Sequence, residues 1–88
     1  MEVKDNKQIT TENTTNVIRQ LILYNSNHLW EDVINQLQKA TKYDIIHCEQ
    51  IAVIAHTKGK ATVKTGTIIE LTGIDCVLKE IRLITEII

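Results

Sequence analysis

The alternation of apolar and polar residues predicts where regular structure begins. Residues 1–16 are polar, rich in Thr and Asn, and without apolar periodicity, so we expect a flexible N-terminal arm. Residues 17–24 are apolar on both alternating faces, with Leu21 on one face and Ile22 on the other. Apolar side chains on both faces are typical of a central strand.

The first helix is predicted to begin near residue 30. Apolar residues recur from Trp30 to Ala40 at positions i, i+3, i+4, i+7 and i+10, which is one face of an amphipathic helix. The four polar residues before it, 25–28, are typical of turns and of helix caps.

A second helix is expected over residues 45–58, with Asp44 as its N-cap and Gly59 at its end. Its apolar arc is wide, because Ile51 and Ile54 flank the main face. We therefore expect this helix to be more buried than the first.

A second strand is expected over residues 60–65, where Ala61 and Val63 alternate with polar neighbours. The Thr-Gly pair that follows is a turn signal. A β-hairpin over residues 60–72 is therefore an alternative to a strand followed by a helix.

A third helix is expected over residues 68–81, opened by a capping box between Thr67 and Glu70. Gly73 inside it costs about 1 kcal/mol relative to alanine. Residues 82–88 are expected to form a last strand. The order β-α-α-β-α-β predicts an α+β fold, a small two-layer sandwich in which a three-stranded antiparallel sheet carries three helices on one face.

Composition narrows the class of protein. A chain of 88 residues holds one domain, here residues 17–88 behind the arm. Its net charge of −1, without a Lys/Arg cluster, excludes nucleic-acid binding through bulk positive charge. The longest apolar runs are four or five residues, against about 20 for a membrane span. The polar N-terminus lacks an apolar signal core, so we expect no secretion signal. We expect a cytoplasmic monomer that binds neither nucleic acid nor membranes.

The two cysteines, Cys48 and Cys76, predict neither a disulfide framework nor a metal site, because their spacing fits no metal motif. His47 and Cys48 are adjacent on the expected helix and point about 100° apart, so they cannot pair as base and nucleophile. We predict a binding protein rather than an enzyme, with no metal or cofactor. A small enzyme that uses one of the thiols is the alternative.

Three short stretches carry a more specific signal. They are residues 21–25 (LILYN), residues 31–44 (EDVINQLQKATKYD) and residues 55–63 (AHTKGKATV), which contains a His-x-x-Gly-Lys-Ala step. Together with the element order and the polar arm, they resemble the ClpS family, adaptors of the bacterial Clp protease. The resemblance extends from residue 17 to about residue 71.

This resemblance implies an adaptor that binds a Clp AAA+ ATPase of the ClpA or ClpC type. Such adaptors present substrates with bulky hydrophobic N-terminal residues, called N-degrons, and their arm engages the ATPase pore. A free α-ammonium has three donors and one positive charge, so its receptor needs convergent acceptors. The family takes them from an Asn-Asp pair after the first strand and from a His. In this chain those positions are Asn25, Ser26 and His56.

The resemblance also implies an apolar pocket with its lid at Trp30 and with Val33, Ala52 and Ala55 in its wall. Ser26 stands where the family has Asp, and the loop before Val33 is one residue shorter than usual. The two alanines either open a deeper hole or leave space that the indole fills.

Three polar residues near this site, Asn27, Glu31 and Asp32, are candidates to replace the missing carboxylate. Two other interpretations are also consistent with the sequence. A divergent ClpS-like domain could dock a Clp ATPase or another partner without reading N-termini. The likeness could also lie in the fold alone, since the C-terminal domain of the ribosomal stalk protein has a related architecture and fold does not determine function.

Overall fold

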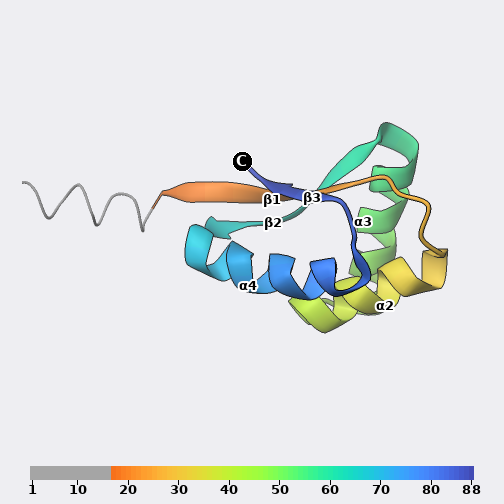
Figure 1. The fold of residues 1–88 in the computed structure, drawn as a ribbon. Helices are drawn as coiled ribbons and strands as arrows, with labels where there is room; N and C mark the ends of the chain where they lie inside the picture. The colour runs from red at the N-terminus through yellow and green to blue at the C-terminus, as the bar shows by residue number, and fades with distance from the viewer. Residues whose placement is uncertain (1–16) are drawn as a thin grey trace, which may run out of the picture.

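A computed structural model describes residues 17–88, so the predicted arm at residues 1–16 lies outside the described residues. The order of elements matches the predicted one (Figure 1). The elements are β1 (Ile18–Tyr24), α2 (Trp30–Thr41), α3 (Ile45–Lys58), β2 (Lys60–Thr67), α4 (Ile68–Leu78), the 3-10 turn η1 (Lys79–Ile81) and β3 (Thr85–Ile87).

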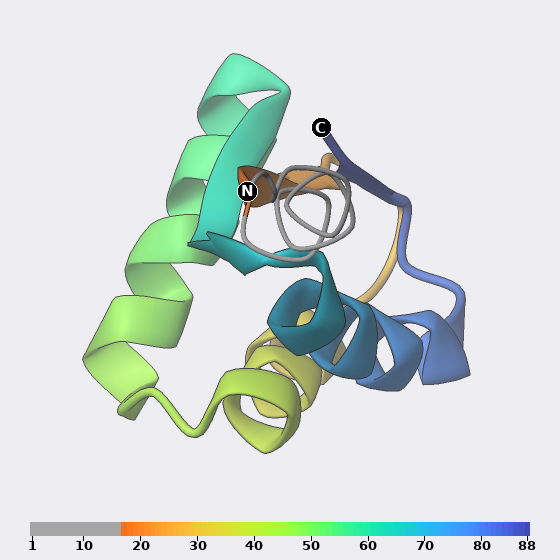
Figure 2. The same cartoon turned by 90° about the vertical axis from the view of Figure 1, so that its left-hand side faces the viewer.

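The three strands form one antiparallel sheet in the order β2-β1-β3, which confirms that β1 is the central strand. The helices cover one face of this sheet (Figure 2). α3 packs on β2, α4 packs on β1 and β2, and α2 lies across α3 and α4. The predicted α+β sandwich is therefore confirmed.

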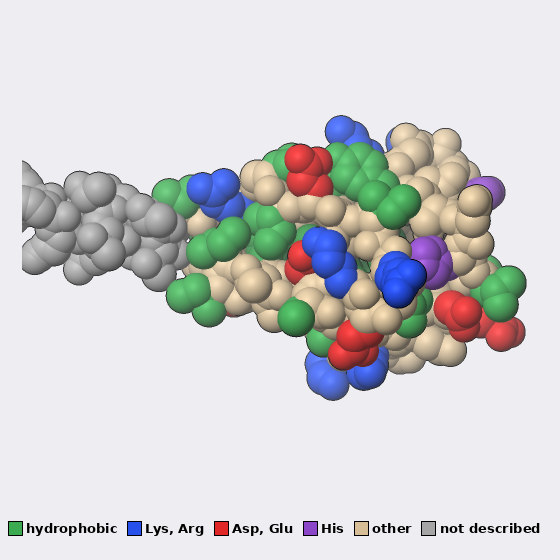
Figure 3. All heavy atoms as spheres, viewed as in Figure 1, with side chains coloured by type: hydrophobic (Ala, Val, Ile, Leu, Met, Phe, Trp, Pro, Cys, Tyr) green, Lys and Arg blue, Asp and Glu red, His purple; other side chains and the backbone are tan. Residues whose placement is uncertain are grey.

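The core lies between the sheet and the helices. Its fully buried side chains come from β1, α2, α3 and α4, and removing each from water contributes about 1.5–3 kcal/mol for a large aliphatic side chain. They are Leu21, Leu23, Leu37, Cys48, Leu71 and Leu78. On the face seen in Figure 3, exposed apolar side chains form separate patches among charged ones.

The second helix is less buried than its apolar arc suggested. Ile51 is buried, but Ile54 is 42% exposed, so the expectation that both would widen the buried face is wrong. The reason is the position of α3 at the side of the fold (Figure 2), where it contacts mainly β2 and α2.

The starts of α3 and α4 have the predicted caps. The Asp44 carboxylate accepts from the His47 N–H at 2.9 Å. Thr67 and Glu70 form a complete capping box. α2 differs, because its N-cap is Leu29, which makes no side-chain hydrogen bond to the helix. The cap expected from the composition of residues 25–28 is therefore not formed by them, and they make up the turn that leads into the helix.

The C-terminal part contradicts two further predictions. β2 continues to Thr67 and α4 follows at once, so the β-hairpin alternative is wrong. The last strand is Thr85–Ile87 rather than residues 82–88. Arg82 has φ 61° and turns the chain, and Leu83 is buried in the core. Backbone bonding to β1 then begins with the Ile84 carbonyl, which accepts from the Tyr24 N–H at 2.9 Å.

Candidate functional site

A small hollow of about 50 Å³ lies where the β1–α2 connection meets the end of α3, and we call it the loop hollow. All seven residues that the resemblance pointed to line it, so the structure brings the whole predicted set together. They are Asn25, Ser26, Trp30, Val33, Ala52, Ala55 and His56. The remaining lining residues are Leu23, Tyr24, His28 and Leu83.

Backbone pairing places Asn25 beside the end of α3. Tyr24 is the last residue of β1 and pairs with Lys60 at the start of β2. The next residue, Asn25, donates its N–H to the carbonyl of Gly59 at 3.0 Å. Gly59 has φ 91° and closes α3, so His56 in the last turn of that helix faces the same hollow.

The polar side chains of the loop hollow fall into two groups. Ser26 Oγ lies 2.7 Å from Nδ1 of His28, and Nε2 of His28 lies 2.5 Å from the carbonyl oxygen of Ile81. Within residues 17–88, the side chains of Asn25 and His56 make no hydrogen bond at all. Their bonding capacity is therefore open toward the hollow.

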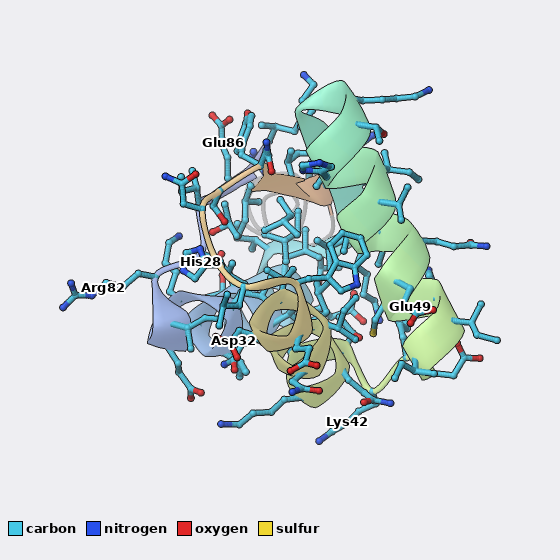
Figure 4. All side chains as sticks on the ribbon, turned by 90° about the vertical axis from the view of Figure 1, so that its right-hand side faces the viewer. His28, Asp32, Lys42, Glu49, Arg82 and Glu86 are labelled. Atoms are coloured by element: carbon cyan, nitrogen blue, oxygen red, sulfur yellow. The ribbon has the colours of Figure 1, made fainter. Side chains whose placement is uncertain are left out.

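His28 is the residue that sequence reasoning missed. The turn composition of residues 25–28 marks a loop, but it carries no sign of a bond to a carbonyl 53 positions further along the chain. Figure 4 shows His28 on the β1–α2 connection, beside the end of α4. Only the tertiary fold reveals this contact.

The apolar part of the loop hollow comes from α3 and the core. Ala52 and Ala55 are each 4% exposed, and Leu83 closes the floor at 3%. Trp30 is 46% exposed, so its indole is not buried as a core side chain.

The indole of Trp30 also lines a second hollow of about 270 Å³ between α2 and α3, which we call the helix hollow. Its other lining residues are Glu31, Ile34, Asn35, Ile45 and Glu49. Trp30 therefore stands between a small hollow and a larger one.

No carboxylate lines the loop hollow among residues 17–88. Of the three candidates to replace one, Asn27 and Asp32 line neither hollow, and Glu31 lines the helix hollow. The negative end of the α3 dipole lies at the loop hollow, because α3 ends there, and it favours a positive group. The Tyr24 hydroxyl donates to Glu86 at 2.6 Å and is thus engaged elsewhere.

Neither cysteine belongs to this site. Cys48 is buried, and desolvation raises the pKa of its thiol, which favours the neutral form over the nucleophilic thiolate. Cys76 is exposed on α4 and lines neither hollow. Residues 17–88 contain no group of three or more His, Cys, Asp or Glu side chains placed to hold a metal ion. In the same range, no helix combines the length and apolarity needed to cross a membrane.

Comparison with known proteins identifies the family. No curated protein matches the chain. The family model described as ATP-dependent Clp protease adaptor protein ClpS matches residues 15–73, about two thirds of the chain. The matched range includes all seven predicted site residues and ends within α4. The chain belongs to the ClpS family of Clp protease adaptors.

Proposed function

We propose that this protein is an adaptor that binds a Clp AAA+ ATPase of the ClpA or ClpC type and presents N-degron substrates to it. The observation that carries the proposal is the convergence of Asn25, Ser26 and His56 on one hollow with an apolar floor. In this proposal residues 17–88 are the adaptor domain, which acts as a cytoplasmic monomer, and residues 1–16 are the arm that engages the ATPase.

The chemistry of the hollow suits the N-terminal ammonium of a substrate. An ammonium has three N–H donors, and Asn25 Oδ1, Ser26 Oγ and an imidazole nitrogen of His56 are three acceptors. The end of α3 adds partial negative charge. A hydrogen bond between neutral groups contributes about 0.5–1.5 kcal/mol, against about 1.5–3 kcal/mol when one partner is charged. No carboxylate of residues 17–88 lines the hollow, so the ammonium itself supplies the charge in these hydrogen bonds.

The size of the loop hollow limits the side chain that can accompany the ammonium. A cavity of about 150 Å³ is known to hold benzene, whereas a single water occupies about 30 Å³ of liquid. The loop hollow, at about 50 Å³, has no room for a large side chain beside the indole. The helix hollow of about 270 Å³ lies on the other side of Trp30. A bulky first residue therefore requires the indole to move toward the helix hollow.

The same observations favour one alternative function. The missing carboxylate and the small loop hollow suit a ClpS-like domain that docks a Clp ATPase without reading N-termini. Such a protein would bind the ATPase and leave free-amine peptides unbound.

The experiment is a titration with fluorescent peptides that begin with Leu, Phe, Tyr or Trp, monitored by anisotropy. We expect saturable binding that is lost when the amine is acetylated or when the first residue is Gly. His56→Ala should weaken binding about fivefold or more, which is one hydrogen bond. His47→Ala, which removes an exposed histidine of the same helix outside the hollow, is the matched control.

A peptide that binds equally well with an acetylated amine, or does not bind at all, would overturn N-degron recognition. Binding of the purified Clp ATPase is then measured directly, and binding without peptide recognition would establish the alternative. Deleting residues 1–16 tests the arm. We expect substrate delivery to fall while peptide affinity stays unchanged.

Restoring the family's carboxylate tests the ammonium site in the other direction. Ser26→Asp should strengthen peptide binding about tenfold, because a charged acceptor replaces a neutral one. Asn27→Asp is the matched control, since it adds the same charge one residue away from the lining of the hollow. Equal effects of the two variants would show that net charge, rather than a placed acceptor, governs binding.

A further inference from the structure

His28 connects two segments that lie far apart along the chain. Its Nδ1 lies 2.7 Å from Ser26 Oγ, and its Nε2 lies 2.5 Å from the carbonyl oxygen of Ile81 in η1. The ring is half-buried, and it lines the loop hollow together with Ser26. The Ser26 hydroxyl is therefore bonded to the His28 ring, and that ring is in turn bonded to the backbone carbonyl of Ile81.

These two contacts determine the direction of each hydrogen bond. A carbonyl oxygen can only accept, so Nε2 of His28 carries a proton and donates to Ile81. In a neutral imidazole the other nitrogen, Nδ1, then has a lone pair and can only accept. The Ser26 hydroxyl must therefore donate its single proton to His28. Its lone pairs remain and are the groups that it can offer to a ligand.

We propose that His28 is a positioning residue that orients the Ser26 hydroxyl as a hydrogen-bond acceptor for the N-terminal ammonium of the substrate. This inference rests on the proposed function of the loop hollow. It explains how a serine takes the place of the family's aspartate, because the serine presents the same acceptor polarity without the charge. Ser26 alone could rotate its proton toward the ligand, and His28 prevents that rotation.

Protonation of His28 would reverse the arrangement. An imidazolium donates from both nitrogens, so Nδ1 would donate to Ser26 and turn the hydroxyl proton away from His28. The ring would also carry a positive charge near the ammonium. The other ionisable groups around this corner include His56 across the hollow and Tyr24 with its bonded partner Glu86 on the sheet. They also include Asp32 on the first turn of α2 and Arg82 beyond the bonded carbonyl. Figure 4 shows Arg82 directed outward from His28.

Two substitutions at this position separate the two contacts. His28→Gln places an amide N–H near the position of Nε2, so it can keep the bond to Ile81 but offers Ser26 no acceptor. His28→Asn places a carbonyl oxygen near the position of Nδ1, so it can keep the acceptor for Ser26 but loses the bond to Ile81. If His28 has a purely structural role, His28→Gln should weaken peptide binding less than His28→Asn. If His28 has the proposed role, His28→Asn should weaken peptide binding less than His28→Gln.

The measurement is the affinity of a free-amine peptide for the full chain and its variants. We expect His28→Gln to weaken binding about threefold to tenfold and His28→Asn to weaken it less. The loss from His28→Gln should disappear in a Ser26→Ala background, because the oriented hydroxyl is already gone. His47→Gln, at an exposed position outside the hollow, is the matched control and should leave affinity unchanged.

The pH profile provides a second readout. Between about pH 7 and pH 5.5, where histidines titrate and the peptide amine is already protonated, the unmodified chain should lose more affinity than His28→Asn. His56 is present in both proteins, so the difference between the two profiles reports His28.

Nitrogen-15 NMR of the imidazole tests the inference without any peptide. We expect the Nε2–H tautomer of His28 at neutral pH, and the Nδ1–H tautomer would overturn the inference alone. The inference alone would also be overturned if His28→Gln weakened peptide binding as strongly in the Ser26→Ala background as in the unmodified chain. The same holds if His28→Gln weakened binding less than His28→Asn. Absence of peptide binding by the unmodified chain would overturn the proposed function, and this inference with it.

Discussion

The two strand-to-helix connections of this protein are built in opposite ways. β2 passes directly into α4, and the start of α4 is closed by the capping box of Thr67 and Glu70. Gly66 permits this closure, because a Cβ at that position would lie 2.5 Å from Oε1 of Glu70. β1 instead enters α2 through five residues, Asn25 to Leu29, and no side chain caps the helix.

The difference shows where polar side chains are used. At α4 the hydroxyl and carboxylate satisfy backbone N–H groups of their own helix. At the β1–α2 connection, Ser26 bonds to His28 and lines the loop hollow, and the N-cap residue Leu29 makes no side-chain hydrogen bond to the helix. α2 is held from its other side, where the buried Gln36 donates to the Val77 carbonyl at 2.6 Å. Stability and ligand binding should therefore respond to different connections.

Removing the capping box should give the largest effect. Thr67→Ala with Glu70→Ala removes one cap and one side-chain hydrogen bond, so we expect the free energy of unfolding to fall by about 2 kcal/mol. For a domain of this size that corresponds to roughly 10 °C in Tm. Denaturant and thermal unfolding measure it, and peptide affinity at 25 °C should not change. A loss of peptide affinity in a folded variant would contradict the expectation that stability and ligand binding depend on different connections.

Giving α2 the cap that it lacks should have a smaller and opposite effect. Leu29 is 72% exposed and has the extended backbone of an N-cap, with φ −63° and ψ 141°. Leu29→Ser should therefore raise the free energy of unfolding by about 1 kcal/mol, measured by urea unfolding. Leu29 does not line the loop hollow, so peptide binding should be preserved. An unchanged stability would show that a side-chain cap at this position adds nothing to the stability of α2.

Ser26→Ala should have the opposite pattern of effects from the α4 variant, with a larger effect on peptide binding than on stability. We expect the free energy of unfolding to fall by no more than about 0.5–1.5 kcal/mol, because Ser26 caps no helix and the variant loses only the hydrogen bond to His28. Peptide affinity should fall about twofold to tenfold, since one acceptor is removed from the hollow. Calorimetric unfolding and peptide anisotropy on the same sample test both statements. A large loss of stability with normal binding would assign Ser26 to the fold.

The smallest effect is expected where β1 ends. The hydrogen bond to Glu86 raises the pKa of the Tyr24 hydroxyl, with desolvation and the Glu86 charge adding to it. Glu86→Gln should move the pKa of Tyr24 down toward the ordinary value of about 10. Ultraviolet titration measures this shift, and Tyr43, whose pKa is raised mainly by burial, is the internal reference. Since the folded state favours the neutral phenol, this contact stabilises the protein below the ordinary pKa and is lost as pH rises.

Patterns confined to a few neighbouring residues were predictable from sequence. The caps at Asp44 and Thr67 and the helix end at Gly59 depend on bonds that span three or four residues, so the sequence contains the whole motif. Helical periodicity located α2 and α3 for the same reason. Family resemblance, which periodicity does not supply, was needed to select seven of the eleven residues that line the loop hollow.

The sequence by itself therefore determined the order of elements, the starts of the three helices and the side-chain caps of two of them. It also determined the central position of β1 and, through the family resemblance, the residues to examine for binding. Tertiary structure alone decided the shortened β3, the exposure of Ile54, the place of Trp30 between two hollows and the bond from His28 to Ile81. Each of these depends on which distant segment packs against the residue. A local sequence pattern does not contain this information, because the packing of the whole core determines which segments come into contact.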